Sequence, residues 1–144
     1  MVDQISVFVE NKGGRLSAVM ETLYKADVNI RALSIADTSD FGLIRLIVTD
    51  TEKAVSALLA ADFTVKVTSV ICVSIPDKPG SLFNVIGAFS AAGISIEYSY
   101  SFMGKHAKQA DIALRVDEQH REAAIELLKK NGSQLVTAAD IGNV

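Results

Sequence analysis

Apolar and polar residues follow two different periods along the chain, and the same succession of periods occurs twice. Apolar residues at every second position predict strands, and apolar residues three and four positions apart predict amphipathic helices. In the first half the expected elements are, in order, a strand over 5–9, a helix from Leu16 to Asp27, strands over 28–37 and 43–49 around a turn at 38–42, a helix after Asp50 and a strand over 63–67. This half therefore predicts the order βαββαβ.

The second half repeats this order. Its expected elements are a strand over 71–75, a helix from Leu82 to Gly93, strands over 94–103 and 110–116, a helix capped by Asp117 and ended by Gly132, a strand over 135–138 and a frayed end at 142–144. A βαββαβ unit forms an antiparallel sheet with both helices on one face. We expect an α+β protein of two tandem ferredoxin-like modules, residues 1–69 and 70–144.

The two halves also agree residue by residue. With an offset of 66 positions, residues 9–30 align with residues 75–96 and are identical at six of the 22 positions. The identical pairs are Lys12/Lys78, Gly14/Gly80, Leu16/Leu82, Val19/Val85, Ala26/Ala92 and Ile30/Ile96. Apolar positions coincide as well, so duplication of one module explains the sequence better than chance.

A glycine-bearing turn joins the first strand to the first helix in each half, at residues 11–16 and 77–82. The first N–H groups of a helix have no partner within the helix, so this arrangement offers a seat for a carboxylate or a phosphate. The same residues also have a purely structural interpretation. Asn11 and Asp77 are good N-cap residues, and Pro79 is common at the start of a helix.

The composition fits two small modules that need a partner surface. The chain has 144 residues, of which 49% are hydrophobic. Modules of about 70 residues are marginal alone, so we expect the halves to pack on each other or on a second chain. The single cysteine, Cys72, lies in a strand and is expected to be a buried small hydrophobe. No apolar run reaches the ~18 residues of a membrane span, and we expect a soluble cytoplasmic protein without membrane contact.

The charge and the motifs argue against several function classes. A net charge of −3 does not favour nucleic-acid binding, and the basic cluster at 105–108 is expected to be a solvated loop. Cys72, His106 and His120 are too scattered for a metal site. The sequence shows no Ser/His/Asp order, paired-carboxylate cleft or phosphate-binding loop. We therefore expect neither catalysis nor a cofactor.

Alternation also predicts which residues lie on the sheet face away from the helices. In the first half these are Phe8, Leu33, Ile35, Leu43 and Ile47, and in the second they are Ser74, Ser95, Glu97, Ser99 and Ser101. The apolar set is expected to pack against another sheet, within the chain or across a homodimer. The aromatics of the second half, Tyr98, Tyr100 and Phe102, share the parity of Ile94 and Ile96 and are expected in the core, which disfavours RNA stacking.

The two turns in this strand order resemble the ACT-domain family of small regulatory modules that bind amino acids. Asp77-x-Pro79-Gly80-Ser81-Leu82 matches the family's first turn, and Gly93-Ile94-Ser95-Ile96 matches its Gly-x-Asn-Ile pattern with serine in place of asparagine. The first copy has Asn11, Gly13 and Asp27 at the Asp, Pro and Gly positions, but keeps Asn29-Ile30. The resemblance covers almost the whole chain, as in stand-alone tandem ACT proteins.

The resemblance implies the ligand-binding residues, because ACT modules pair through sheet edges and bind an effector between one module's first turn and its neighbour's second strand. The residues so implied are Asn11, Gly13, Gly14 and Leu16 with Ser95 and Ile96 for one site, and Asp77, Pro79, Gly80, Ser81 and Leu82 with Asn29 and Ile30 for the other. Backbone N–H groups would hold the carboxylate of an amino acid, and side-chain and strand oxygens would hold its ammonium.

Two functions remain open from the sequence. The first is a non-catalytic regulatory protein that binds an amino acid between modules, as a homodimer. The alternative is a regulatory subunit that docks on an enzyme of amino-acid metabolism without binding a ligand itself.

Overall fold

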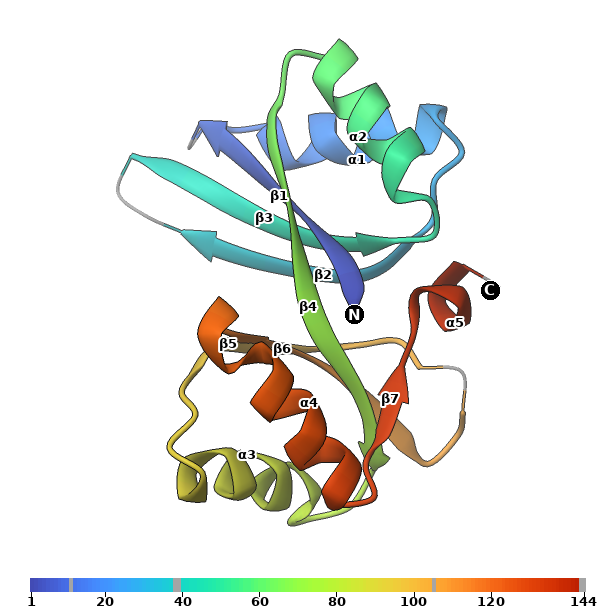
Figure 1. Ribbon diagram of the computed structural model, residues 1–144. Coiled ribbons are helices and arrows are strands. Elements are labelled where there is room, and N and C mark those ends of the chain that lie inside the picture. The colour runs from blue at the N-terminus through green and yellow to red at the C-terminus, as the bar shows by residue number, and fades with distance from the viewer. Residues whose placement is uncertain (11, 38–39, 105, 143–144) are drawn as a thin grey trace. The chain divides into compact units, whose positions relative to one another are not determined.

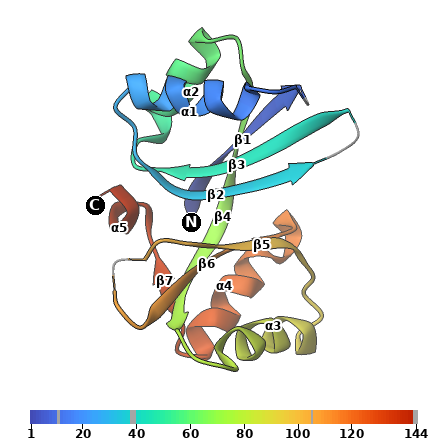
Figure 2. The same ribbon diagram turned by 180° about the vertical axis from the view of Figure 1, so that it is seen from behind.

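The computed structural model describes residues 1–10, 12–37, 40–104 and 106–142 (Figures 1 and 2). Asn11, the turn residues 38–39, Lys105 of the basic cluster and residues 143–144 lie outside this part of the chain. The chain divides into two compact units. Module 1 consists of residues 3–68 with the C-terminal segment from Ala139, and module 2 consists of residues 1–2 and 69–138.

Module 1 has the predicted βαββαβ order. Its elements are β1 (Val2–Glu10), α1 (Arg15–Lys25), β2 (Ile30–Asp37), β3 (Phe41–Val48), α2 (Thr51–Ala60) and the first part of β4 (Thr64–Pro76). The strands lie in the order β2-β3-β1-β4, and β1 and β2 both pair antiparallel with β3. Both helices cover the same face of this sheet (Figure 1). Asp50 caps α2 as expected, since its side chain accepts a hydrogen bond from the Lys53 N–H at 3.1 Å.

Module 2 repeats the arrangement. Its elements are the rest of β4, α3 (Ser81–Ala91), β5 (Ile96–Phe102), β6 (Gln109–Val116), a 3-10 turn (Glu118–His120), α4 (Arg121–Lys130) and β7 (Gln134–Val136). The strand order is β7-β4-β6-β5, and each of these pairings is antiparallel. The α+β fold of two ferredoxin-like modules is therefore confirmed.

The junction and the C-terminus differ from the sequence prediction. The two strands expected at 63–67 and 71–75 form one strand, β4, which runs for 13 residues and supplies a strand to both modules. The residues between them, Thr68 to Val70, contain neither proline nor glycine that would end a strand. Gly142, expected in a frayed end, lies in a short helix, α5 (Ala138–Gly142), in which Ile141 is buried.

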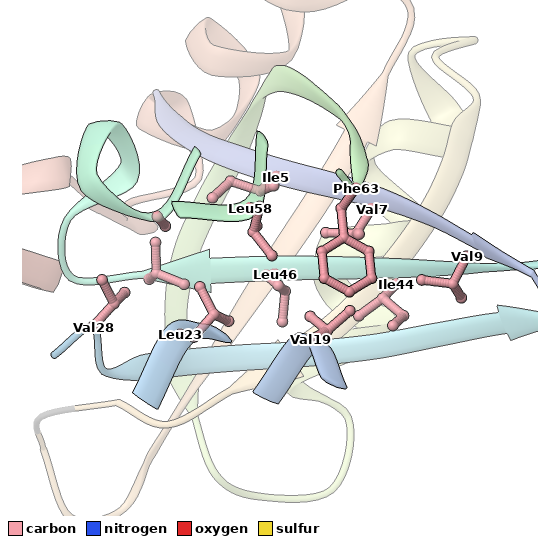
Figure 3. Packing of buried hydrophobic residues seen from close by; sticks show 12 residues of the cluster. Ile5, Val7, Val9, Val19, Leu23, Val28, Ile44, Leu46, Leu58 and Phe63 are labelled. Atoms are coloured by element: carbon pink, nitrogen blue, oxygen red, sulfur yellow. The ribbon is translucent and has the colours of Figure 1, made fainter. Parts of the chain in front are cut away.

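Each module has its own hydrophobic core between its sheet and its helices. In module 1 the core combines β1 and β3 with α1, α2 and Phe63 (Figure 3). Its buried members are Ile5, Val7, Val9, Val19, Leu23, Val28, Ile44, Leu46, Val48, Ala54, Leu58 and Phe63. The core of module 2 is built from the equivalent elements, with Phe89 of α3 at 1% exposure.

A bulge in β2 overturns the predicted apolar face of module 1. Ile30 pairs with Val48 but Ala32 pairs with Ile47, so Arg31 is an extra residue in the ladder. A one-residue shift moves every later side chain to the other face of a sheet. Leu33 and Ile35 consequently oppose Leu46 and Ile44 on the helix side.

The five residues Phe8, Leu33, Ile35, Leu43 and Ile47 thus do not form one patch. Phe8 opposes Leu43 on the face away from the helices, and Ile47 is fully buried. Leu33 and Ile35 are 44% and 53% exposed because β2 is the last strand at that edge of the sheet.

Module 2 has a bulge at the equivalent residue, Glu97. Ile96 pairs with Val116 and Tyr98 pairs with Arg115. Tyr98, Tyr100 and Phe102 therefore lie on the face away from the helices and are only half-buried, and the prediction that they belong to the core is wrong. The same bulge puts Ser99 and Ser101 opposite Leu114 and Ile112 on the helix side, so their predicted place on the face away from the helices is wrong, although both are exposed. Ser74, expected on an open polar face, is buried at 7% exposure.

The two phenylalanines of α3 test the core of module 2 directly. Phe89 is 1% exposed and Phe83 is 77% exposed. Truncating a buried phenylalanine removes apolar contacts and leaves a cavity, so Phe89→Ala should lower the free energy of unfolding by about 3–5 kcal/mol. Phe83→Ala on the same helix should cost less than ~0.5 kcal/mol. Urea unfolding followed by circular dichroism measures both, and equal losses would contradict this core.

Candidate functional site

A left-handed glycine stands directly before the first helix of each module. Gly14 has φ 83° before α1, and Gly80 has φ 91° before α3. Residues with a side chain rarely adopt this conformation, so glycine is the natural occupant. Both glycines are the N-cap residues, and neither helix receives a side-chain cap. The structural interpretation of Asp77 as an N-cap is therefore wrong, because Gly80 takes that position.

These two turns leave backbone donors at the start of each helix. The Gly14 carbonyl accepts from the Ala18 N–H at 3.0 Å, and the Gly80 carbonyl accepts from the Asn84 N–H at 2.9 Å. The helical ladder therefore begins at the glycines. The Arg15 and Ser81 N–H groups donate within the turns, to Lys12 O at 3.4 Å and to Lys78 O at 3.3 Å, so the donors left at each helix start are those of the next residues. A helix N-terminus of this kind favours an anion by its hydrogen-bond donors and by its dipole.

The turn residues nominated by the sequence lie together around these glycines. Gly13, Asp77 and Pro79 are exposed, and Leu16 and Leu82 in the first helical turns are 40% and 42% exposed. Ser81 differs from its neighbours, because it is buried with 6% exposure. Asn11 lies outside the described residues.

The strand residues nominated with the turns line two shallow hollows at the other end of the first helices. Asn29 borders a hollow of about 510 Å³ with Tyr24, Asp27 and Thr49. The Asn29 carbonyl accepts from the Thr49 N–H at 3.0 Å, which fixes the start of β2. In module 2, Ser95 and Ile96 border a hollow of about 400 Å³ with Gly93 and Phe89.

Within one module the turn and the strand end do not meet. Helices α1 and α3 each have 11 residues and separate the two places. At 1.5 Å per residue this separation is about 16 Å, longer than a free amino acid. Within a single module the predicted turn residues and strand residues therefore lie apart, and a site of the predicted composition would need a neighbouring module.

The sequence analysis missed a polar groove in module 2. The groove has a volume of about 620 Å³ and lies between the end of β4, the start of α3 and the segment from α4 to β7. Its lining includes Lys78, Asn84, Gln109 and Ser133, none of which the motifs indicated. The internal alignment contains part of the signal, since Asn84 aligns with Ala18 and Ser81, which also lines the groove, aligns with Arg15, whereas Lys78 aligns with an identical lysine, Lys12.

The contact between Asp117 and His120 has a structural role at the start of α4. The Asp117 carboxylate accepts from the His120 N–H at 2.9 Å and lies 2.8 Å from His120 Nδ1. This side-chain contact with His120 lowers the pKa of the Asp117 carboxyl, which caps the turn before α4.

Across the described ranges, no three His, Cys, Asp or Glu side chains come close enough to hold a metal ion. No helix in the described part of the chain has the length and apolarity for a membrane span.

The geometry defines a protein made of two βαββαβ modules, each with an open, glycine-headed helix. A family model described as an ACT domain pair matches residues 1–143. The chain belongs to this family, and the resemblance inferred from the two turns is confirmed. Membership of the family supports a regulatory role.

Solved structures agree with this assignment. The chain is similar to protein BT0572 from Bacteroides thetaiotaomicron, with 40% identity, a TM-score of 0.89 and coverage of 99% of this chain and 96% of that chain. It is also similar in fold to the ligand-free regulatory subunit of aspartate kinase from Thermus thermophilus, with 16% identity, a TM-score of 0.63 and coverage of 89% of this chain and 90% of that chain. A comparison with curated proteins gave no match.

The state of Cys72 gives a chemical test of module 2. Cys72 is 1% exposed, and burial raises the pKa of its thiol to about 12. The thiolate is the reactive form, so the native protein at pH 8 should react with a disulfide reagent at least about a hundredfold more slowly than the unfolded protein. Cys72→Ser/Ser99→Cys, which moves the thiol to an exposed position on β5, should react rapidly without denaturant. Rapid reaction of native Cys72 would contradict its burial.

Proposed function

We propose that the chain is a non-catalytic regulatory protein that binds an amino acid at interfaces between ACT modules. The observation that carries the proposal is the pair of equivalent, side-chain-uncapped helix starts at Gly14 and Gly80. A structural cap would have used a side chain there, as Asp50 does for α2. The two helix starts occupy equivalent positions in the two modules, and each offers a place for one carboxylate.

The residues around each seat suit the two charges of an amino acid. The N–H groups after Gly80 receive the carboxylate. The Asp77 carboxylate, which does not cap α3, and a strand carbonyl near Asn29 of a neighbouring module receive the ammonium. In the reciprocal site, Gly13, Gly14 and Leu16 act with Ser95 and Ile96, and Asn11 takes the place of Asp77. Leu16 and Leu82, which are 40% and 42% exposed, form the wall against the ligand's side chain.

The strength of binding explains why a neighbour is needed. An exposed helix N-terminus contributes only ~0.3–1 kcal/mol to anion binding, whereas micromolar affinity needs about 8 kcal/mol. Several charge-assisted hydrogen bonds of about 1.5–3 kcal/mol each reach that value when water is excluded. A second module that closes over the turn excludes the water. Ligand binding then stabilises the pairing of modules, and the pairing reports the presence of the ligand.

The neighbour is a second copy of the chain, paired through the outer strands. Strands β2 and β5 lie at the ends of their strand orders. On β2, Leu33 and Ile35 project on the helix side with 44% and 53% exposure, next to unpaired backbone groups of an edge strand. Pairing of such edges buries these side chains and brings a turn toward a strand of the other copy.

A second candidate function is docking on an enzyme of amino-acid metabolism without a ligand. Its support is the similarity in fold to a regulatory subunit of aspartate kinase, of which the aligned region covers 90%. The two functions differ in the free protein, because only the first predicts that an amino acid alone stabilises it.

The first test is a thermal-shift screen with the twenty amino acids, followed by calorimetry with the best one. At about 100 times Kd a true ligand should stabilise the protein by about 2.7 kcal/mol, which is a shift of several degrees in Tm. Gly14→Val and Gly80→Val impose a side chain at positive φ, and each should remove one of the two sites and halve the stoichiometry. Each variant is the matched control of the other. No shift with any amino acid, together with co-purification of an enzyme, would favour docking instead.

The second test concerns the homodimer. Light scattering should give twice the chain mass of 15.4 kDa for the wild type. Leu33→Asp/Ile35→Asp places charges on the edge and should return the mass to that of one chain. Leu59→Asp, at a 55% exposed position on α2, is the control and should leave the mass unchanged. A dimer that survives the β2 changes would place the interface elsewhere.

A further inference from the structure

The first helices of the two modules differ at two exposed positions that are equivalent in the repeat. Tyr24 of α1 is 82% exposed, and Ser90 occupies its position in α3. Phe83 of α3 is 77% exposed, and Ser17 occupies its position in α1. Each module therefore exposes one aromatic ring and one serine, but module 1 has its ring near the end of the helix and module 2 has its ring near the start.

Tyr24 and Ser90 lie beside the strand residues of the proposed amino-acid sites. Tyr24 borders the hollow that contains Asn29. Ser90 borders the hollow that contains Ser95 and Ile96. Each hollow belongs to a single module, so a neighbouring copy that reaches Asn29 also meets Tyr24, and one that reaches Ser95 also meets Ser90.

Phe83 lies at the other end of α3, beside the turn that forms the other half of a site. It follows Leu82, which the proposed function places in the ligand wall. Phe83 shares a helix face with Ile86 and Ser90, which are three and seven positions further on. Ile86 and Ser90 border the hollow at the start of β5, the outer strand. Phe83 is therefore on the side of α3 from which a copy that pairs through β5 approaches.

The surroundings of Phe83 carry no charge. No Asp, Glu, Lys or Arg occurs over residues 81–96, whereas the aligned residues 15–30 include Arg15, Glu21, Lys25 and Asp27. Leu82 and Ile86, next to Phe83 on the helix surface, are 42% and 41% exposed. The start of α3 thus presents an apolar stripe, which suits contact with another apolar group.

The proposed pairing of copies puts the two rings into one site and the two serines into the other. One site combines the Gly80 turn with Asn29 of the other copy. It therefore receives Phe83 from one copy and Tyr24 from the other. The reciprocal site, at the Gly14 turn, receives the equivalent serines, Ser17 and Ser90.

We propose that the two sites are not equivalent, and that the site at Gly80, closed by Phe83 and Tyr24, selects an amino acid with a large apolar side chain. The two rings lie against that side chain and exclude water from it. Two serines bury far less apolar area, so the site at Gly14 binds the same amino acid more weakly. This selectivity rests on the proposed function and names the ligand class of its tighter site.

Calorimetry of the full chain with L-leucine, L-phenylalanine and, as the small reference, L-alanine tests the selectivity. The better of the two large amino acids should bind in two unequal steps, each with one ligand per chain. The tighter step should be at least about tenfold stronger than any binding of L-alanine. Phe83→Ser/Tyr24→Ser gives the Gly80 site the side chains of the Gly14 site and should weaken the tighter step at least about tenfold.

Two further variants are the controls of this titration. Leu59→Ser removes a 55% exposed apolar side chain from α2 and should leave both steps unchanged. Ser17→Phe/Ser90→Tyr supplies the missing rings and should bring the weaker step close to the tighter one. Equal steps in the wild type, or no weakening by Phe83→Ser/Tyr24→Ser, would overturn the selectivity and leave the proposed function in place. Absence of binding by all twenty amino acids would overturn both.

A cross-link tests the same arrangement without a ligand. A disulfide needs Cβ atoms about 3.5–4.5 Å apart, so Phe83→Cys/Tyr24→Cys should form a covalent dimer on mild oxidation, seen on a non-reducing gel. Phe83→Cys/Ser17→Cys joins residues of different sites and should keep the mass of one chain, 15.4 kDa. The native Cys72 is buried and stays reduced in both variants. A covalent dimer from the second variant, or none from the first, would overturn the arrangement.

Discussion

The left-handed glycine before each first helix is the constraint on which the modules depend. Gly14 and Gly80 turn the chain from the first strand onto the sheet within a few residues, and a Cβ at this φ would be strained. This turn places α1 and α3 over the core face. Because the N-cap is a glycine without a side chain, the same turn leaves the helix start uncapped. The same glycine therefore determines both where the helix lies on the sheet and that its N-terminus has no side-chain cap.

A second constraint is the bulge at Arg31 and Glu97, one equivalent residue in each module. It reverses the alternation along the outermost strand, so Leu33 and Ile35 lie on the helix side and Tyr98 and Tyr100 lie on the opposite side. The conserved position of the bulge in the two halves shows that it belongs to the repeated module. It decides which side chains the edge strands present.

The two modules share one fold, but different side chains occupy the corner beside the start of the first helix in each of them. Module 1 closes that corner with the Arg15–Phe63 contact and neutralises Lys12 with Glu10. Module 2 has Ser81, Ser133 and Pro76 at the equivalent positions, and a polar groove results.

The sequence by itself determined the element order, the duplication, the two glycine turns and the family, because these depend on local periodicity and on residues with unusual backbone freedom. Tertiary structure decided the rest. One continuous β4 joins the modules because no residue at 68–70 ends a strand, and the bulges depend on cross-strand register, which alternation along one strand does not encode. The groove depends on the distance between Ser81 and Ser133, which lie far apart in sequence and meet only when α3 and the end of α4 pack on the same sheet.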